Sequence, residues 1–106
     1  MEPLAYVVYI TAQNREEAEK IGRHLVKEKV AACVNIVDNI KSLFWWEKKM
    51  DEAAECLLIV KTSVEKFKKL EAAVKRIHSY QVPEIIALPV MDGSKDYLDW
   101  INSSLK

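Results

Sequence analysis

Glycine, proline and cysteine are all scarce in this sequence, whose 106 residues include two glycines, three prolines and two cysteines. With so few breakers of regular structure, and with no repeat or low-complexity tract, nothing suggests a linker, and residues 1–106 are expected to form a single domain. Two cysteines are too few for a disulfide framework. Both Cys33 and Cys56 lie in apolar runs, which favours reduced thiols that pack as small hydrophobic side chains.

An excess of charge of either sign is also missing, because sixteen basic side chains balance sixteen acidic ones. This balance argues against a broad binding surface for nucleic acid or for an acidic membrane. No segment has the apolar length of a membrane span, and the opening MEPLAYVVYITA has an acidic residue where a signal peptide needs basic ones. We therefore expect no nucleic-acid partner, no membrane association and a cytoplasmic location.

Hydrophobic periodicity predicts the element order βαββαβ with one further helix at the end. Asn14 with Glu17, and Thr62 with Glu65, have the spacing of capping boxes that would begin the two main helices. The expected strands are residues 5–12, 30–47 with a bend at 37–39, 56–62 and 84–90; the expected helices are 14–29, 62–78 and a short segment after 94; and residues 47–55 form the turn between the second and third strands.

This order predicts an α+β fold of the ferredoxin-like type with an additional C-terminal helix. Strand-to-parallel-strand connections through a helix are right-handed, so both main helices should cover the same face of one sheet. Gly22 lies inside the first helix, where it costs about 1 kcal/mol relative to alanine. Its presence there indicates that this helix packs closely against the sheet.

The second face of the sheet would then be bare, and in a monomer its strands should alternate apolar with polar residues. Instead YVVYI (6–10), CLLIV (56–60) and EIIALPV (84–90) are nearly continuous apolar runs. Trp45 and Trp46 would point to opposite faces of a strand, so each ring needs apolar cover. We expect one ring in the monomer core and the other in an interface with further copies of the chain. The alternative is a bulge that sends both rings into one core.

Six segments in order carry a resemblance to a known family: VYITA (8–12), LVKEKVAACVNI (25–36), SLFWWE (42–47), IVKT (59–62), HSYQVPEIIALPV (78–90) and DYLDWI (96–101). Together they resemble the CutA family of divalent-cation tolerance proteins. The resemblance implies a homotrimer of ferredoxin-like subunits with PII-like architecture, a role in metal tolerance, and copper or another divalent cation with no organic cofactor. The chain departs from the family pattern at three positions: Ser79 stands where the family usually has proline, Phe44 where it commonly has tyrosine, and Lys48 where it usually has glycine. The change at Lys48 puts the geometry of the hairpin turn in question.

Four residues form the candidate metal- or ligand-binding set: Cys33, His78, Tyr80 and Glu84. Copper(II) prefers imidazole and oxygen ligands, whereas copper(I) prefers thiolate. No pair in the set has the spacing of a dedicated metal motif, so the expectation of a metal comes from the resemblance. His78 has a second interpretation, a helix-end histidine bonded to a carbonyl, and Glu84 is also a plausible partner for the charge of Lys61.

Rival functions on this fold lack their required residues. An acylphosphatase needs a glycine-rich phosphate loop, but TAQNREE (11–17) has no glycine and two acids. An RNA-recognition module displays aromatic residues on its central strands, and CLLIVKT (56–62) has none. The sequence shows no nucleophile–base pair that would indicate an enzyme, so we expect a non-enzymatic protein. The remaining alternative is a PII-like signalling or scaffold trimer that binds a small metabolite or a protein partner at its subunit clefts.

Overall fold

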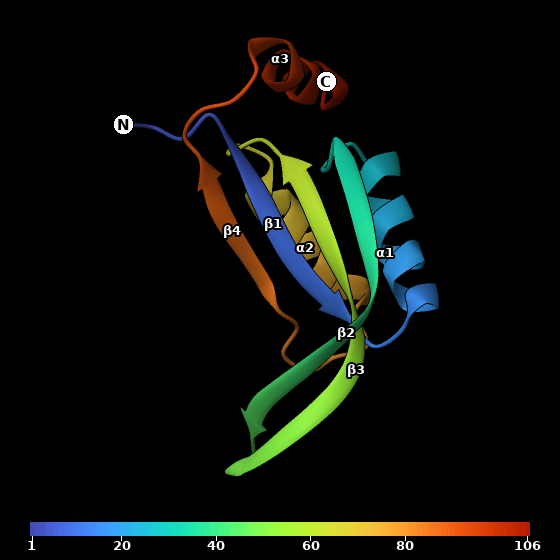
Figure 1. The fold of residues 1–106 in the computed structure, drawn as a ribbon. Helices are drawn as coiled ribbons and strands as arrows, with labels where there is room; N and C mark the ends of the chain where they lie inside the picture. The colour runs from blue at the N-terminus through green and yellow to red at the C-terminus, as the bar shows by residue number, and fades with distance from the viewer.

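The computed structural model describes residues 1–106 as one four-stranded antiparallel sheet with two helices on one face and a third helix at one end (Figure 1). The strand order is β2-β3-β1-β4. The elements are β1 Ala5–Ala12, α1 Arg15–Lys27, β2 Cys33–Trp46, β3 Lys49–Thr62, α2 Phe67–Ile77, β4 Ile85–Val90 and α3 Lys95–Ser104. The expected βαββαβ order with an added helix is confirmed. None of the three helices is both long and apolar enough to cross a bilayer.

The start of α1 is fixed by the expected capping pair. The side chain of Asn14 accepts a hydrogen bond from the Glu17 N–H (2.8 Å), and Glu17 Oε1 accepts one from the Gln13 N–H (3.1 Å). A Cβ added at Gly22 would lie 3.1 Å from Val34 Cγ1. The glycine therefore lets α1 approach β2 closely, as the sequence indicated.

The expected capping box at the start of α2 is wrong. Thr62 is fully buried at the end of β3, where its hydroxyl donates to the Val30 carbonyl oxygen at 2.6 Å. The helix begins later, at Phe67, after a turn in which Ser63 Oγ accepts from the Lys66 N–H at 3.2 Å. A buried hydroxyl needs a partner within the protein. Because the Thr62 hydroxyl bonds to the Val30 carbonyl oxygen, it does not cap the start of α2.

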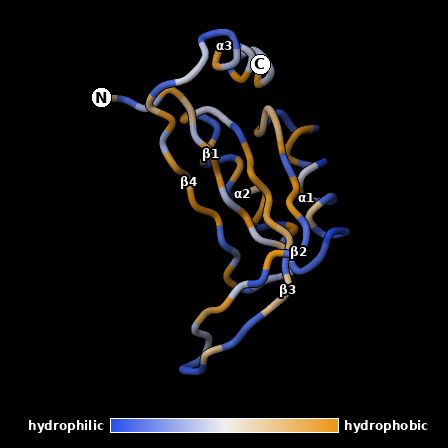
Figure 2. Tube along the Cα trace, viewed as in Figure 1, coloured by the Kyte–Doolittle hydropathy of each residue, from blue (hydrophilic) through white to orange (hydrophobic).

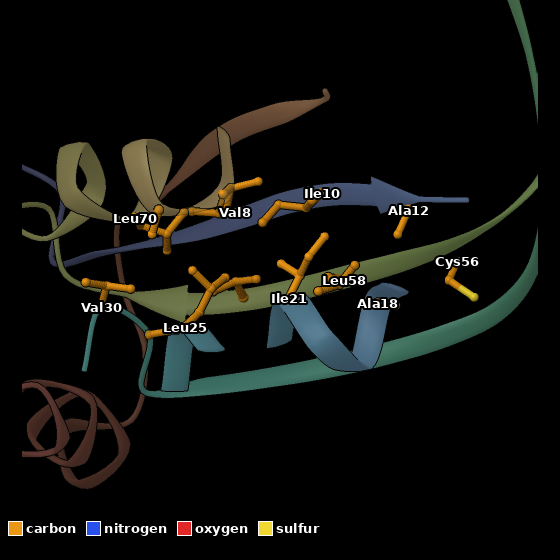
Figure 3. Close-up of a cluster of buried hydrophobic side chains, with 14 residues drawn as sticks. Val8, Ile10, Ala12, Ala18, Ile21, Leu25, Val30, Cys56, Leu58 and Leu70 are labelled. Atoms are coloured by element: carbon orange, nitrogen blue, oxygen red, sulfur yellow. The ribbon is translucent and has the colours of Figure 1, made fainter. Parts of the chain in front are cut away.

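The main core lies between the sheet and helices α1 and α2, with side chains from both layers pointing toward one another (Figure 3). Its largest fully buried side chains come from β1, α1, β3 and α2: Val8, Ile10, Ile21, Leu25, Leu58, Val60, Leu70 and Val74. Cys56 is also buried in this cluster, as expected for a packing cysteine.

The other face of the sheet is covered at one end only. There α3 places Ile101 and Leu105 against Ala5 in a separate small cluster. Farther along β4, Ile86 and Leu88 remain exposed, beside Tyr9 and Val7 of β1 in the antiparallel register. The open part of this face is therefore apolar, as the continuous apolar runs predicted, and a single copy of the chain leaves it without cover.

Strands β2 and β3 run past the rest of the sheet as a two-stranded arm (Figure 1). The strand register shifts between Val37 and Ile40, at the expected bend. The expected turn over residues 47–55 is wrong, because only Glu47 and Lys48 separate the strands. Both have positive φ (50° and 67°), the geometry of a two-residue type I′ hairpin turn. Lys48 thus adopts the left-handed conformation without the glycine of the family pattern.

The arm also corrects the expectation that one tryptophan enters the monomer core. Trp45 is 76% exposed and Trp46 is 43% exposed, because the arm projects beyond the helices that cover the sheet. The two rings do point to opposite faces, since Trp45 pairs with Met50 and Trp46 with Lys49 in consecutive register positions. Hydropathy along the chain changes from apolar in the sheet to polar at the tip of the arm (Figure 2).

Candidate functional site

A cleft of about 770 Å³ lies between the arm and the loop that joins α2 to β4. The arm contributes aromatic and acidic side chains from alternate positions of its two strands, and the loop contributes polar and acidic ones. The lining residues that matter below are Phe44, Trp46, Asp51 and Glu55 from the arm and β3, and Tyr80 and Glu84 from the loop. The site thus joins segments that are far apart in the sequence.

Glu55 and Tyr80 form the polar base of the cleft. The Tyr80 hydroxyl donates to Glu55 Oε2 at 2.6 Å, and Glu55 is only 8% exposed. Burial, and then the adjacent Glu55 carboxylate, raise the pKa of Tyr80, so the hydroxyl keeps its proton and remains a donor. Charge-assisted bonds of this kind are short and strong. They fix the carboxylate with its second oxygen available to the cleft.

Glu84 adds a second carboxylate to the same site. Partial burial, and then the charge of Glu55, raise the pKa of Glu84 above its ordinary value. A like charge nearby disfavours the ionised form of Glu84. No lysine or arginine lines the cleft, so nothing in this chain neutralises the pair, and the cleft favours a cation.

His78 lies behind this site and supports it. Its side chain is fully buried, Nε2 lies 2.7 Å from the Thr11 carbonyl oxygen, and Nδ1 accepts the Tyr80 N–H at 3.0 Å. A neutral imidazole with its proton on Nε2 satisfies both bonds. Both ring nitrogens therefore already have hydrogen-bond partners. This matches the second interpretation of His78 from the sequence, a helix-end histidine bonded to a carbonyl.

Glu17 fixes the same loop from the side of α1. Its Oε2 accepts the Ser79 N–H at 2.8 Å. Burial favours the neutral acid, but hydrogen bonds from Ser79 and Gln13 outweigh it and lower the pKa of Glu17. The loop that carries Tyr80 is therefore fixed by bonds to both α1 and β1.

Cys33 lies at a different place. It pairs with Lys61 in the sheet register, six residues along β3 from Glu55, which is about 20 Å at the usual rise of a strand. The structure thus brings His78, Tyr80 and Glu84 together but separates Cys33 from them. The expected pair of Lys61 with Glu84 does not form, because Lys61 donates instead to Asn35 Oδ1 and its Nζ lies 4.0 Å from the Cys33 sulfur.

Sequence reasoning missed Glu55, Asp51 and the role of Trp46 in the cleft. One signal was present, a glutamate directly before the apolar run CLLIV, but residues 47–55 were assigned to a turn. No group of three or more histidine, cysteine or acidic side chains in this chain is arranged to hold a metal ion. The carboxylates offer oxygen ligands, which fit a divalent cation, but they supply only part of a coordination shell.

The comparisons with known proteins agree on one family. The model described as "CutA1 divalent ion tolerance protein" matches residues 6–104. The divalent-cation tolerance protein CutA of Archaeoglobus fulgidus is 50% identical over 99 residues, which make up 93% of this chain and 96% of the relative. A rice relative, "Protein CutA 1, chloroplastic", is 45% identical over 100 residues, and this chain spans 56% of its length.

Solved structures give the same result. The A. fulgidus CutA structure, described as periplasmic, has a TM-score of 0.93 at 48% identity and covers 96% of this chain and 99% of its own. The Thermus thermophilus structure has a TM-score of 0.90 at 46% identity, covering 92% and 94%. The fold expected from the resemblance is confirmed. The match over residues 6–104 and a half-identical relative covered almost completely show that the chain belongs to the CutA1 divalent ion tolerance family.

Proposed function

We propose that this protein acts in divalent-cation tolerance as a homotrimer that binds the cation in the cleft between the arm and the loop after α2. The observation that carries the proposal is the acidic cleft, where the buried Glu55 and the nearby Glu84 meet without any basic side chain in the lining. The names of the relatives point to the same class of ligand.

Exposed apolar surface supports the homotrimer. Ile86 and Leu88 on the open face and Trp45 and Met50 on the outer face of the arm are all at least 40% exposed. Surface of this kind is normally covered by another protein surface. The choice of three copies rests on the resemblance to the CutA family. A second copy could also add ligands to the cleft, since one chain supplies only part of a coordination shell.

Copper(II) is the ion that we propose to test first. Copper(II) accepts oxygen ligands such as the carboxylates of the cleft, whereas copper(I) favours thiolate. The thiol of Cys33 is far from the cleft, because Cys33 begins β2 and pairs with Lys61, six residues along β3 from Glu55. Since both nitrogens of His78 are bonded, we assign that residue to support of Tyr80 rather than to the ion. We further propose a cytoplasmic, non-enzymatic protein without an organic cofactor.

The signalling alternative is favoured by one observation, the size of the cleft. A volume of about 770 Å³ falls in the range of small-molecule pockets and exceeds what a bare ion needs. In this second function a small molecule would occupy the cleft, and contact with metal ions would be incidental.

Native mass spectrometry of the metal-free protein, titrated with copper(II), tests the main proposal. We expect a trimer that takes up copper in a fixed ratio to chains, and weaker uptake by Glu84→Gln. Trp45→Asp should lower the mass of the assembly, and Lys48→Asp at the tip of the same arm is the matched control. A monomeric wild type would refute the trimer. Scattered uptake that follows excess copper, equal in wild type and Glu84→Gln, would refute the cation site.

A further inference from the structure

We propose that Cys33 and Lys61 are a site of oxidative modification, at which hydrogen peroxide forms a covalent cross-link that joins the cysteine sulfur to the lysine nitrogen through one oxygen atom. This site lies outside the cation cleft, and it does not depend on the proposed function. The feature that carries it is a thiol and an amine on neighbouring strands, which the fold brings together at one polar side chain.

The backbone places these two side chains opposite each other. Cys33 begins β2, Lys61 lies near the end of β3, and the two are direct partners in the antiparallel register. Directly opposed residues point to the same face of a sheet and are near neighbours there. The Lys61 Nζ lies 4.0 Å from the Cys33 sulfur. The flexible stem of lysine lets the nitrogen close the remaining distance to a bridging oxygen.

Asn35 holds the amine and the thiol at one point. Its Oδ1 accepts a hydrogen bond from the Lys61 ammonium and lies 3.8 Å from the Cys33 sulfur. Lys61 forms no ion pair, in contrast to four other lysines of the chain. No carboxylate therefore draws its nitrogen away from the thiol.

The pair lies at the end of the sheet that α3 covers, not on the open part of that face. Ala32, directly before Cys33, packs against the cluster of Ala5, Ile101 and Leu105 beneath α3. Burial, and then the neighbouring Cys33, raise the pKa of the α3 residue Tyr97, which fits a phenol close to the thiol. The reaction joins two residues of one chain and needs only a small oxidant, so it requires no free surface for a large partner.

No second thiol of the chain can react with an oxidised Cys33. Both cysteines are free, and Cys56 is five residues along β3 from Lys61, which is about 17 Å at the usual rise and on the opposite face. A disulfide needs Cα atoms no more than about 7 Å apart. The amine of Lys61 is therefore the nucleophile that the fold places beside the Cys33 sulfur.

The reaction takes two molecules of hydrogen peroxide. The Cys33 sulfur attacks the first one: an S–O bond forms, the O–O bond breaks and water leaves, which gives a sulfenic acid. The Lys61 ammonium releases one proton to solvent, and the N–O bond then forms as the second peroxide takes up two electrons and two further waters leave. Nitrogen and sulfur each lose two electrons, which reduce the two peroxides.

Mass spectrometry of the full chain after treatment with hydrogen peroxide, under denaturing and non-reducing conditions, tests the proposal. We expect a product that has gained one oxygen and lost two hydrogens, and that dithiothreitol returns to the starting mass. Trypsin does not cleave after a modified lysine, so the cross-linked peptide should join residues 30–41 to residues 50–66. Cys56→Ser is the matched control for the other thiol and should give the same product as wild type.

Lys61→Arg separates the cross-link from simple oxidation of the thiol. Arginine keeps the positive charge, but its guanidinium does not form the link, so this variant should gain whole oxygen atoms and lose no hydrogen. A wild type that behaves in the same way would overturn the proposal. So would a product that has lost two hydrogens without gaining oxygen, or a cross-link that maps to Cys56 or to another lysine.

Discussion

Replacing Tyr80 with phenylalanine should destabilise the fold by removing one hydrogen bond at the base of the cleft. The Tyr80 hydroxyl lies 2.6 Å from the carboxylate of the nearly buried Glu55. A hydrogen bond to a charged group contributes about 1.5–3 kcal/mol. Water in the cleft can replace the hydroxyl in part, so we expect the lower value, about 1.5 kcal/mol.

Urea unfolding, followed by far-ultraviolet circular dichroism at one fixed chain concentration, measures this loss. For a slope of about 1.5 kcal/mol per molar urea, a loss of about 1.5 kcal/mol lowers the midpoint by about 1 M. Tyr6→Phe is the matched control, since the ring of Tyr6 packs edge-on against Phe67 and its hydroxyl makes no hydrogen bond in the structure.

A double-mutant cycle with Glu55→Gln assigns the loss to the pair. If the hydroxyl acts through Glu55, the two substitutions should be coupled by at least about 0.5 kcal/mol, as expected for residues in contact. Strictly additive effects, or a Tyr80→Phe midpoint equal to that of Tyr6→Phe, would show that this bond does not support the cleft.

Three further predictions concern charge and packing. Burial and the charge of Glu55 raise the pKa of Glu84. The stability that this shift contributes is complete below the unfolded pKa of Glu84 and is lost as pH rises through its folded pKa. Glu84→Gln should therefore be more stable than wild type at pH 7, and equal melting temperatures of the two proteins at that pH would contradict this prediction. The pKa of Glu17 is lowered, so the stability that its ionised carboxylate contributes is present above the unfolded pKa and is lost as pH falls through the folded pKa. Glu17→Gln should therefore be less stable than wild type at pH 7, and its melting temperature should fall less on acidification. Gly22→Ala should change the free energy of unfolding by less than about 1 kcal/mol, because the higher helix propensity of alanine is offset by crowding of its Cβ against Val34 at 3.1 Å. Gly22→Val should lower the free energy of unfolding by about 2 kcal/mol through overpacking. Urea unfolding measures both changes.

The main elements were predictable because their local signals agree with their tertiary roles. The Asn14–Glu17 pair begins α1, and the apolar periodicity of residues 15–27 matches the face that packs on the sheet. The same kind of signal failed at Thr62. Its spacing to Glu65 matches a capping box, but the long-range bond to Val30, which the local sequence does not encode, decided its conformation.

The arm could not be predicted from periodicity. Residues 49–54 are mostly exposed on both faces, so their strand carries no alternation of apolar and polar side chains, and a long polar turn was the natural interpretation. Pairing with β2 alone keeps this segment extended. Placing it in a turn hid the register that puts Asp51, Glu55 and Trp46 on one wall of the cleft.

Only part of the candidate site was predicted. The residues that lie close together in the sequence were grouped correctly, whereas those brought together or separated by tertiary packing were not. Tyr80 and Glu84 are close in sequence and do share the cleft. Cys33 was grouped with them through the family resemblance, but the length of β2 places it at the other end of the sheet. The bonding of His78 to Thr11 and to the Tyr80 N–H depends on packing between α2 and β1.

Both chain termini lie at the end of the sheet opposite the arm (Figure 1). Leu105 is nearly buried, and the Lys29 ammonium donates to the backbone oxygen of Lys106 at 2.8 Å. A dye or surface tether attached through a spacer after Lys106, or at the fully exposed Met1, would therefore project away from the cleft. Immobilised in this orientation, the protein would present the acidic mouth of the cleft to the solution, which suits it to surface-based binding sensors.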